Sequence, residues 1–61
     1  MYTLVGINGN AYSVMGYASA CMKREGKTKE QVDAYVKEAK AGDYDNLLSV
    51  SDIMIDSLNS L

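Results

Sequence analysis

Hydrophobic residues recur every three or four positions in three stretches of the chain, and glycines separate these stretches. This spacing predicts helices over residues 11–25, 29–41 and 46–59. Gly26 follows the first stretch and Gly42 follows the second, at the position where a glycine commonly ends a helix. The chain is therefore expected to contain three helices joined by two short turns.

The starts of the second and third helices carry their own signals. Thr28 and Gln31 form a capping box, in which each side chain can bond a free backbone amide of the other. Asp43 or Asp45 can cap the third helix. With these signals the sequence predicts a mainly α fold with a single domain over residues 1–61. The architecture expected is a small three-helix domain with a short N-terminal strand or extended arm.

The N-terminal segment allows two interpretations. Residues 2–7 are rich in β-branched and aromatic types, which favour a short strand or an extended arm. Asn8-Gly9-Asn10 predicts a turn, because glycine and asparagine tolerate a positive φ. After this turn, residues 10–15 either pair back with residues 2–7 as a hairpin or begin the first helix with Asn10 as its N-cap. The alanine and methionine residues that follow favour the helix, and the hairpin stays open as the alternative.

The predicted third helix carries more apolar surface than a small three-helix domain requires of one helix. Its polar residues fill one stripe of about 100°, and apolar residues spread over roughly the remaining 220°. These apolar residues are Leu47, Leu48, Val50, Ile53, Met54, Ile55, Leu58 and Leu61. The predicted second helix, in contrast, has one narrow apolar face. The third helix is therefore expected to lie either between two neighbours or between its own core and a second chain, and the small size of the chain favours the second chain.

The predicted first helix supports the same interpretation. Its large apolar residues lie on one side, and the opposite side carries no charge before Lys23. Gly16 and Ala20 are four residues apart, so they leave a shallow groove into which another helix can pack closely. Either the third helix or the N-terminal arm of the same chain fills this groove, or a second copy does. We therefore predict a non-enzymatic protein–protein interaction module that forms a homodimer or small homo-oligomer. The predicted contact residues are Tyr12, Gly16, Tyr17, Ala20, Ile53, Ile55 and Leu58.

Charge divides the chain into thirds. Residues 1–22 carry none, residues 23–42 hold all six bases and four acids, and residues 43–61 hold four aspartates and no base. The net charge of −2 argues against direct nucleic-acid binding. The acidic stripe suggests an alternative function, a small acidic regulator or inhibitor that occupies a basic nucleic-acid-binding site of a partner protein. The stripe consists of Asp45, Asp52 and Asp56.

The residues that usually carry catalysis or metal binding are scarce. The chain has no histidine and one cysteine, Cys21, so the sequence predicts no enzyme, no metal site and no cofactor. Residues 43–46 have half the pattern of a calcium loop, and helix capping accounts for their aspartates. The Asn8–Asn10 turn could hold a small anion at a helix start, but the ending of a nucleotide-binding P-loop is missing. A tight turn that requires glycine is the simpler interpretation.

The uncharged first third is not expected to enter a membrane. Thr3, Gly6 and the Asn8–Asn10 turn interrupt the apolar run that a signal peptide or a spanning helix requires. A lone cysteine without a disulfide partner fits a reducing compartment. The sequence therefore predicts a cytoplasmic location and no membrane contact.

Two stretches of the chain carry a family resemblance. Leu4–Tyr17 (LVGINGNAYSVMGY) and Gly42–Leu48 (GDYDNLL) resemble small uncharacterised proteins of Firmicute bacteria and their phages or prophages. The resemblance spans nearly the whole chain and implies a bacterial or phage cytoplasmic setting. In that setting the predicted interaction module would present its surface to a host or phage protein. It implies no activity and no catalytic residue. Met15-Gly16-Tyr17 is similar to the loop signature of ubiquitin-associated domains, although here the tripeptide falls inside a predicted helix.

Overall fold

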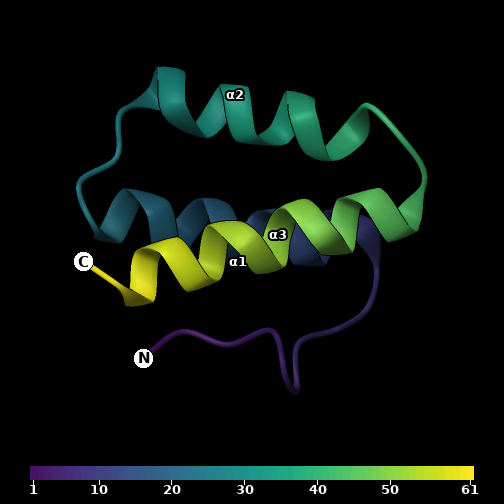
Figure 1. Cartoon of the computed structure of the whole chain (residues 1–61), viewed down its shortest axis with the longest axis horizontal. Helices are drawn as coiled ribbons and strands as arrows, with labels where there is room; N and C mark the ends of the chain where they lie inside the picture. The colour runs from purple at the N-terminus through teal and green to yellow at the C-terminus, as the bar shows by residue number, and fades with distance from the viewer.

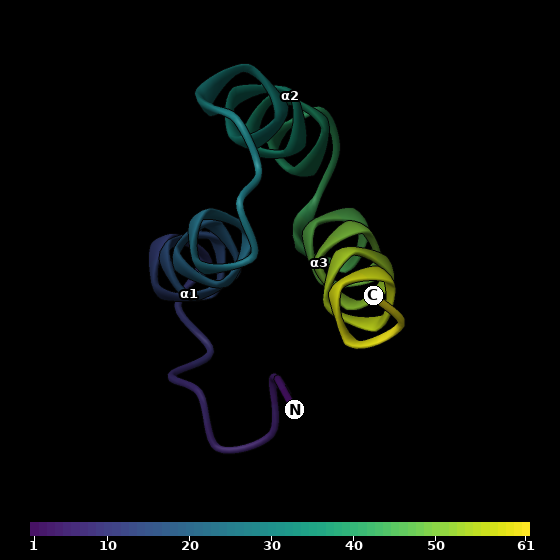
Figure 2. The same cartoon turned by 90° about the vertical axis from the view of Figure 1, so that its left-hand side faces the viewer.

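Three helices are present in the computed structural model, which describes all 61 residues. α1 spans Ala11–Arg24, α2 spans Lys29–Lys40 and α3 spans Tyr44–Asn59. Successive helices run antiparallel, so α1 and α3 point the same way (Figure 1). Seen along their length the helices form a triangle, in which each packs against the other two (Figure 2). The predicted fold class, a mainly α three-helix domain, is confirmed.

The turn between α1 and α2 uses the signals that the sequence shows. Gly26 has a φ of +83°, directly after the C-cap of α1. Glycine adopts this left-handed conformation without steric cost, so it ends the helix here. Thr28 and Gln31 form the predicted capping box, with the Gln31 N–H donating to Thr28 Oγ1 at 3.1 Å and the Thr28 N–H donating to Gln31 Oε1 at 2.8 Å. The boundary between these two helices is therefore set locally.

The turn between α2 and α3 is held by Asn46. Asp43 rather than Asp45 caps α3, because its carboxylate accepts the Asn46 N–H at 2.9 Å, and the helix begins two residues earlier than predicted. The Asn46 side-chain amide donates to the Glu38 carbonyl at 3.1 Å, near the end of α2. An added Cβ atom at Gly42 would lie 2.9 Å from the Cβ atom of Asn46. Glycine is therefore required at this turn for close approach, and its φ is not positive.

The core lies between the three helices and consists of eleven buried hydrophobic residues. They are Val14, Met15, Ala18, Cys21 and Met22 from α1, Val32, Tyr35 and Ala39 from α2, and Leu47, Ile55 and Leu58 from α3. The narrow apolar face predicted for the second helix is therefore the face that α2 buries. Met15-Gly16-Tyr17 lies in the middle of α1, so no loop of the ubiquitin-associated kind is present.

One polar contact is buried between α2 and α3. Ser51 is completely buried, and its hydroxyl shares a hydrogen bond of 2.5 Å with the phenol of Tyr35. Burial raises the pKa of the Tyr35 phenol, and the bond with Ser51 opposes part of that rise. Each hydroxyl is satisfied by the other, so the pair joins α2 to α3 without leaving an unpartnered polar atom in the core.

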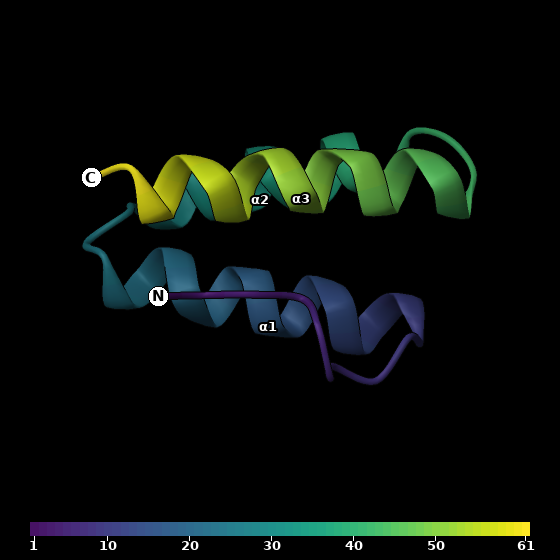
Figure 3. The same ribbon diagram turned by 60° about the horizontal axis from the view of Figure 1, so that its bottom comes forward.

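Residues 1–10 form an irregular arm that contains no strand, and the segment predicted as extended, residues 2–7, is interrupted by a turn at residues 4–7. The arm reverses direction at a turn in which the Ile7 N–H donates to the Leu4 carbonyl at 3.1 Å. Gly6 has a φ of +84° in this turn, which favours glycine. The arm runs along α1 and α3 on the side away from α2 (Figures 2 and 3). The arm therefore covers the side of α1 and α3 that α2 does not cover.

The hairpin alternative for residues 10–15 is wrong. α1 begins at Ala11, and the Asn10 side chain caps it by accepting the Tyr12 N–H at 2.9 Å. The reversal of the chain also lies before the predicted Asn8–Asn10 turn, because the glycine with the positive φ is Gly6 and not Gly9. The helix is preferred because Asn10 supplies its cap locally, whereas a hairpin would have kept residues 11–15 out of the core.

Candidate interaction surfaces

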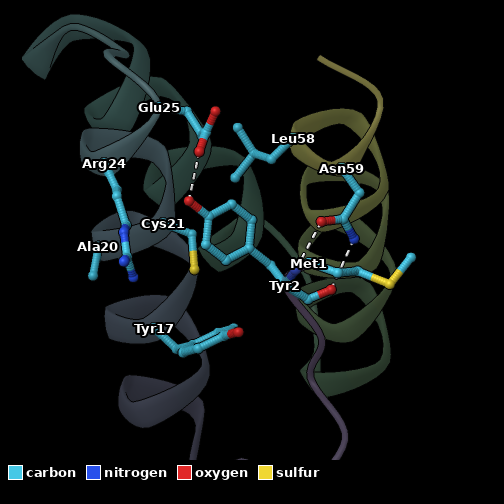
Figure 4. Close-up of a pocket in the computed structure, with 9 residues that line it drawn as sticks. All are labelled: Met1, Tyr2, Tyr17, Ala20, Cys21, Arg24, Glu25, Leu58 and Asn59. Atoms are coloured by element: carbon cyan, nitrogen blue, oxygen red, sulfur yellow. Dashed lines mark hydrogen bonds between the residues drawn. The ribbon is translucent and has the colours of Figure 1, made fainter.

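Tyr2 fastens the N-terminal arm to the helices (Figure 4). Asn59, at the end of α3, accepts the Tyr2 N–H through Oδ1 at 2.7 Å and donates to the Tyr2 carbonyl through Nδ2 at 2.8 Å. These two bonds satisfy the backbone of Tyr2 much as a neighbouring strand would. On the other side, the Tyr2 phenol donates to Glu25 Oε2 at 2.6 Å, at the end of α1. The arm is thereby tied to both helices.

The Glu25 carboxylate holds the Tyr2 phenol in its neutral form. The hydrogen bond to this carboxylate is the main cause that raises the pKa of Tyr2, and burial adds to it. A second bond joins arm and helix, because the Thr3 N–H donates to the Tyr17 hydroxyl at 3.2 Å. An open cleft of about 710 Å³, the arm cleft, remains beside Tyr2 between the arm, α1 and α3.

Three predicted contact residues share one exposed face of α1, which we call the α1 flank: Tyr12, Gly16 and Ala20. Tyr12 is 74% exposed. An added Cβ atom at Gly16 would meet no other atom within 4 Å, so no part of this chain fills the groove beside it. The interpretation in which the third helix or the arm fills this groove is therefore wrong. Tyr17, also predicted, is half-buried beside the flank and bonded to the arm.

Ile55 and Leu58 do not lie on a surface, and their predicted role as contact residues is wrong. Both are 3% exposed and belong to the core. The sequence assigned the apolar surplus of α3 to a second chain, but α1, α2 and the arm cover most of it. Tyr2 and Leu4 of the arm pack against the core on the side away from α2. Ile53, in contrast, is 67% exposed, so it is the one predicted α3 contact that remains accessible.

The exposed face of α3 combines acidic residues with this isoleucine. We call it the α3 flank: Asp45, Asp52, Ile53 and Asp56. The one ion pair of the chain, Lys29–Asp33 at 4.0 Å, lies in α2, so none of the three carboxylates is paired. Because α1 and α3 pack side by side, their exposed faces point away from each other (Figure 2). The predicted contact residues therefore belong to two separate surfaces.

A shallow pocket of about 360 Å³ lies where α1 and α3 begin and α2 ends. Tyr12 and Tyr44 line it, and Lys40 Nζ lies 6.0 Å from the centre of the Tyr12 ring. The Tyr44 hydroxyl donates to the Gly9 carbonyl. At the start of α1, beside the turn considered for anion binding, the Tyr12 N–H already donates to the Asn10 side chain. The Asn8–Asn10 segment thus anchors the arm and caps a helix.

Sequence reasoning did not identify the clamp formed by Tyr2, Glu25 and Asn59, or the buried Ser51. Tyr2 and Asn59 are 57 positions apart, and periodicity compares only near neighbours. Asn59 gave no distinct signal, because Asp56 and Ser57 in the same last turn are also polar and stay exposed. Ser51 gave none either, since a serine fits the core or the surface equally well.

Comparison with other proteins adds no family to this description. No protein-family model, no curated protein and no solved structure matches the chain. None of the three helices has the length and apolar character that crossing a bilayer requires. No three histidine, cysteine, aspartate or glutamate side chains come together as metal ligands. The candidate surfaces are therefore the α1 flank, the α3 flank and the arm cleft.

Proposed function

We propose that this chain is a non-enzymatic protein–protein interaction module that works as a small homo-oligomer. The observation that supports it is the α1 flank, an exposed helix face whose own residues are uncharged and which has open space beside Gly16. The centres of protein interfaces are poor in charge and rich in aromatic residues, and Tyr12 stands at one end of this face. A chain of 61 residues also buries a smaller share of its surface than a large domain does, so association supplies stabilisation that larger domains find internally.

The α1 flank suits a second α1 helix. Gly16 and Ala20 lie four residues apart on one side, and their small size lets two helix axes approach closely. In a dimer with twofold symmetry the same face of both copies meets, so Tyr12 of each copy packs against the small residues of the other. The α1 residues of this contact carry no charge, since α1 has none before Lys23, and Lys40 of α2 lies beside it with Nζ 6.0 Å from the centre of the Tyr12 ring.

We place this module in a bacterial or phage cytoplasm, with a host or phage protein as a further partner. The setting rests on the resemblance of Leu4–Tyr17 and Gly42–Leu48 to small Firmicute and phage proteins. Cys21 adds support, because it is a single free thiol buried in the core, which fits a reducing compartment.

Two exposed alanines provide a matched test of the α1 flank. Ala20→Glu places a charge in the flank, and Ala34→Glu places the same charge on an exposed position of α2. The first substitution should weaken self-association by at least about tenfold, and the second should leave it unchanged. Sedimentation equilibrium at micromolar concentration measures both constants. Equal association constants for the two variants would contradict the proposal.

The α3 flank supports a second candidate, a small acidic regulator or inhibitor that occupies a basic nucleic-acid-binding site of a partner protein. Asp45, Asp52 and Asp56 are exposed and have no ion pair within the chain. Ile53 gives this acidic face an apolar centre, and an apolar centre within a polar rim is the usual arrangement of an interface.

An arginine-rich helical peptide is the probe for this second candidate. Its affinity should fall steeply between about 0.05 M and about 0.5 M salt, because salt screens exposed charges. Asp52→Asn with Asp56→Asn should weaken binding, whereas Glu30→Gln with Asp33→Asn removes the same charge from α2 and should not. Fluorescence anisotropy gives the affinities. The candidate fails if both double variants bind the peptide equally.

A further inference from the structure

The first part of the arm is bound to the helices only near its free end. Tyr2 and Thr3 make all the hydrogen bonds that join this part to a helix. Residues 4–8 make hydrogen bonds only within the arm, although Leu4 packs against the core. The next bond to a helix is at Gly9, whose carbonyl accepts from α3. The arm therefore consists of a docking segment, residues 2–3, and a hinge, residues 4–8.

One turn in the hinge directs the docking segment to its own groove. The bond from the Ile7 N–H to the Leu4 carbonyl, with Gly6 at a φ of +84°, folds the arm back between α1 and α3. If this turn opens, the five residues of the hinge can extend to about 17 Å. That reach is similar to the shortest dimension of the molecule, 16 Å. The docking segment can then enter the same groove of a neighbouring copy.

We propose that two copies of this chain exchange their N-terminal arms, so that Tyr2 of each docks between α1 and α3 of the other. This inference rests on the proposed self-association and identifies a residue that each copy supplies. The bonds to Asn59, Glu25 and Tyr17 involve only the docking segment. They are therefore the same in a closed chain and in an exchanged dimer, whereas the turn at Gly6 opens and Leu4 leaves the core of its own chain.

The arm cleft favours a second copy as the neighbour. The chain's own arm leaves about 710 Å³ open beside Tyr2, and Tyr17 and Ala20 of α1 line this space. Ala20 also belongs to the α1 flank, so the cleft and the flank adjoin. The hinge of a second copy, crossing to this groove, covers the open side of the cleft. Arm exchange and contact through the α1 flank then form one continuous interface.

An equal mixture of isotope-labelled and unlabelled chains, unfolded together and refolded, distinguishes exchanged arms from closed ones. At millimolar concentration we expect NOEs between Tyr2 of one copy and Asn59 of the other, because these residues are joined by bonds of 2.7 and 2.8 Å. Dimers without these contacts between copies would overturn arm exchange and leave the proposed self-association intact. A single-chain mass at every concentration would overturn both.

Two left-handed glycines supply a matched pair of variants. Alanine is disfavoured at a positive φ by roughly fivefold to thirtyfold, so Gly6→Ala disfavours the closed turn by that factor. Each exchanged dimer opens two such turns, and the factor therefore applies twice. Gly6→Ala should raise the association constant at least about 25-fold. Gly26→Ala is the control, since Gly26 has a φ of +83°, equally open surroundings and a place outside the arm. It should lower stability without raising association. Equal association constants for the two variants would contradict arm exchange.

Discussion

The α1 flank and the α3 flank are exposed faces of neighbouring helices, yet they suit different partners. Each presents one large exposed hydrophobic residue, Tyr12 at 74% and Ile53 at 67%. The α1 flank has no charged residue of its own and only Lys40 of α2 beside Tyr12, whereas three unpaired carboxylates share the α3 flank with Ile53. Contact through the first should tolerate salt, and contact through the second should weaken as salt screens the carboxylates. Exposure of an apolar side chain therefore indicates an interface, and the surrounding charge indicates the partner.

The largest expected effect distinguishes the buried face of α3 from its exposed face. Leu58→Glu places a carboxylate among buried apolar side chains and should cost more than about 3 kcal/mol, which is most of the stability of so small a chain. Ile53→Glu changes an exposed residue and should stay within about 0.5 kcal/mol. Urea unfolding measures both. If Leu58→Glu keeps full stability, the core assignment of α3 is wrong and the α3 flank extends further around the helix.

A smaller effect tests the buried contact that joins α3 to α2, on the side of α3 opposite the α3 flank. Tyr35→Phe and Ser51→Ala should each cost about 1–3 kcal/mol, because each leaves a buried hydroxyl without its partner. The double variant should cost less than the sum of the two single ones. Thermal unfolding of all four proteins gives the coupling energy. Strictly additive losses would show that the two hydroxyls do not support one another. Salt dependence should be unchanged throughout, since this pair lies away from both flanks.

The smallest expected effect is the release of the arm at high pH. The bond to Glu25 raises the pKa of Tyr2 above its ordinary value of 10.0. The neutral phenol is therefore favoured in the folded chain. The stabilisation that its hydrogen bond gives to the docked arm is complete below pH 10 and is lost as the pH rises through the raised pKa. Amide NMR signals of Asn59 should shift above pH 10 in the unmodified chain and stay constant in Tyr2→Phe. The same shift in both proteins would assign it to another group.

The helices were predictable because their signals are local. The left-handed Gly26 and the capping box of Thr28 and Gln31 act within a few residues of each helix end. The start of α3 was less certain, because Asp43 and Asp45 are both acceptable caps by type. The structure selects the first, whose carboxylate reaches the Asn46 N–H.

The candidate site was only partly predictable because its central contacts are distant in the sequence. Tyr12, Gly16 and Ala20 were found from helical spacing, and they share an open face. Ile55 and Leu58 were misplaced because the arm covers part of α3, and no local pattern shows where an arm will fold. That cover depends on Tyr2 meeting Asn59, 57 positions away. Helical spacing therefore identified the faces, and the path of the arm decided which of them stayed exposed.

Sedimentation equilibrium at low and high salt tests self-association through the α1 flank most directly. At tens of micromolar we predict twice the 6.6 kDa mass of one chain. This mass should not change between about 0.05 M and about 0.5 M salt, because no residue of the α1 flank is charged. It should fall toward the single-chain value in Ala20→Glu and not in Ala34→Glu. A single-chain mass in all three proteins, or a dimer that dissociates as salt rises, would contradict the account.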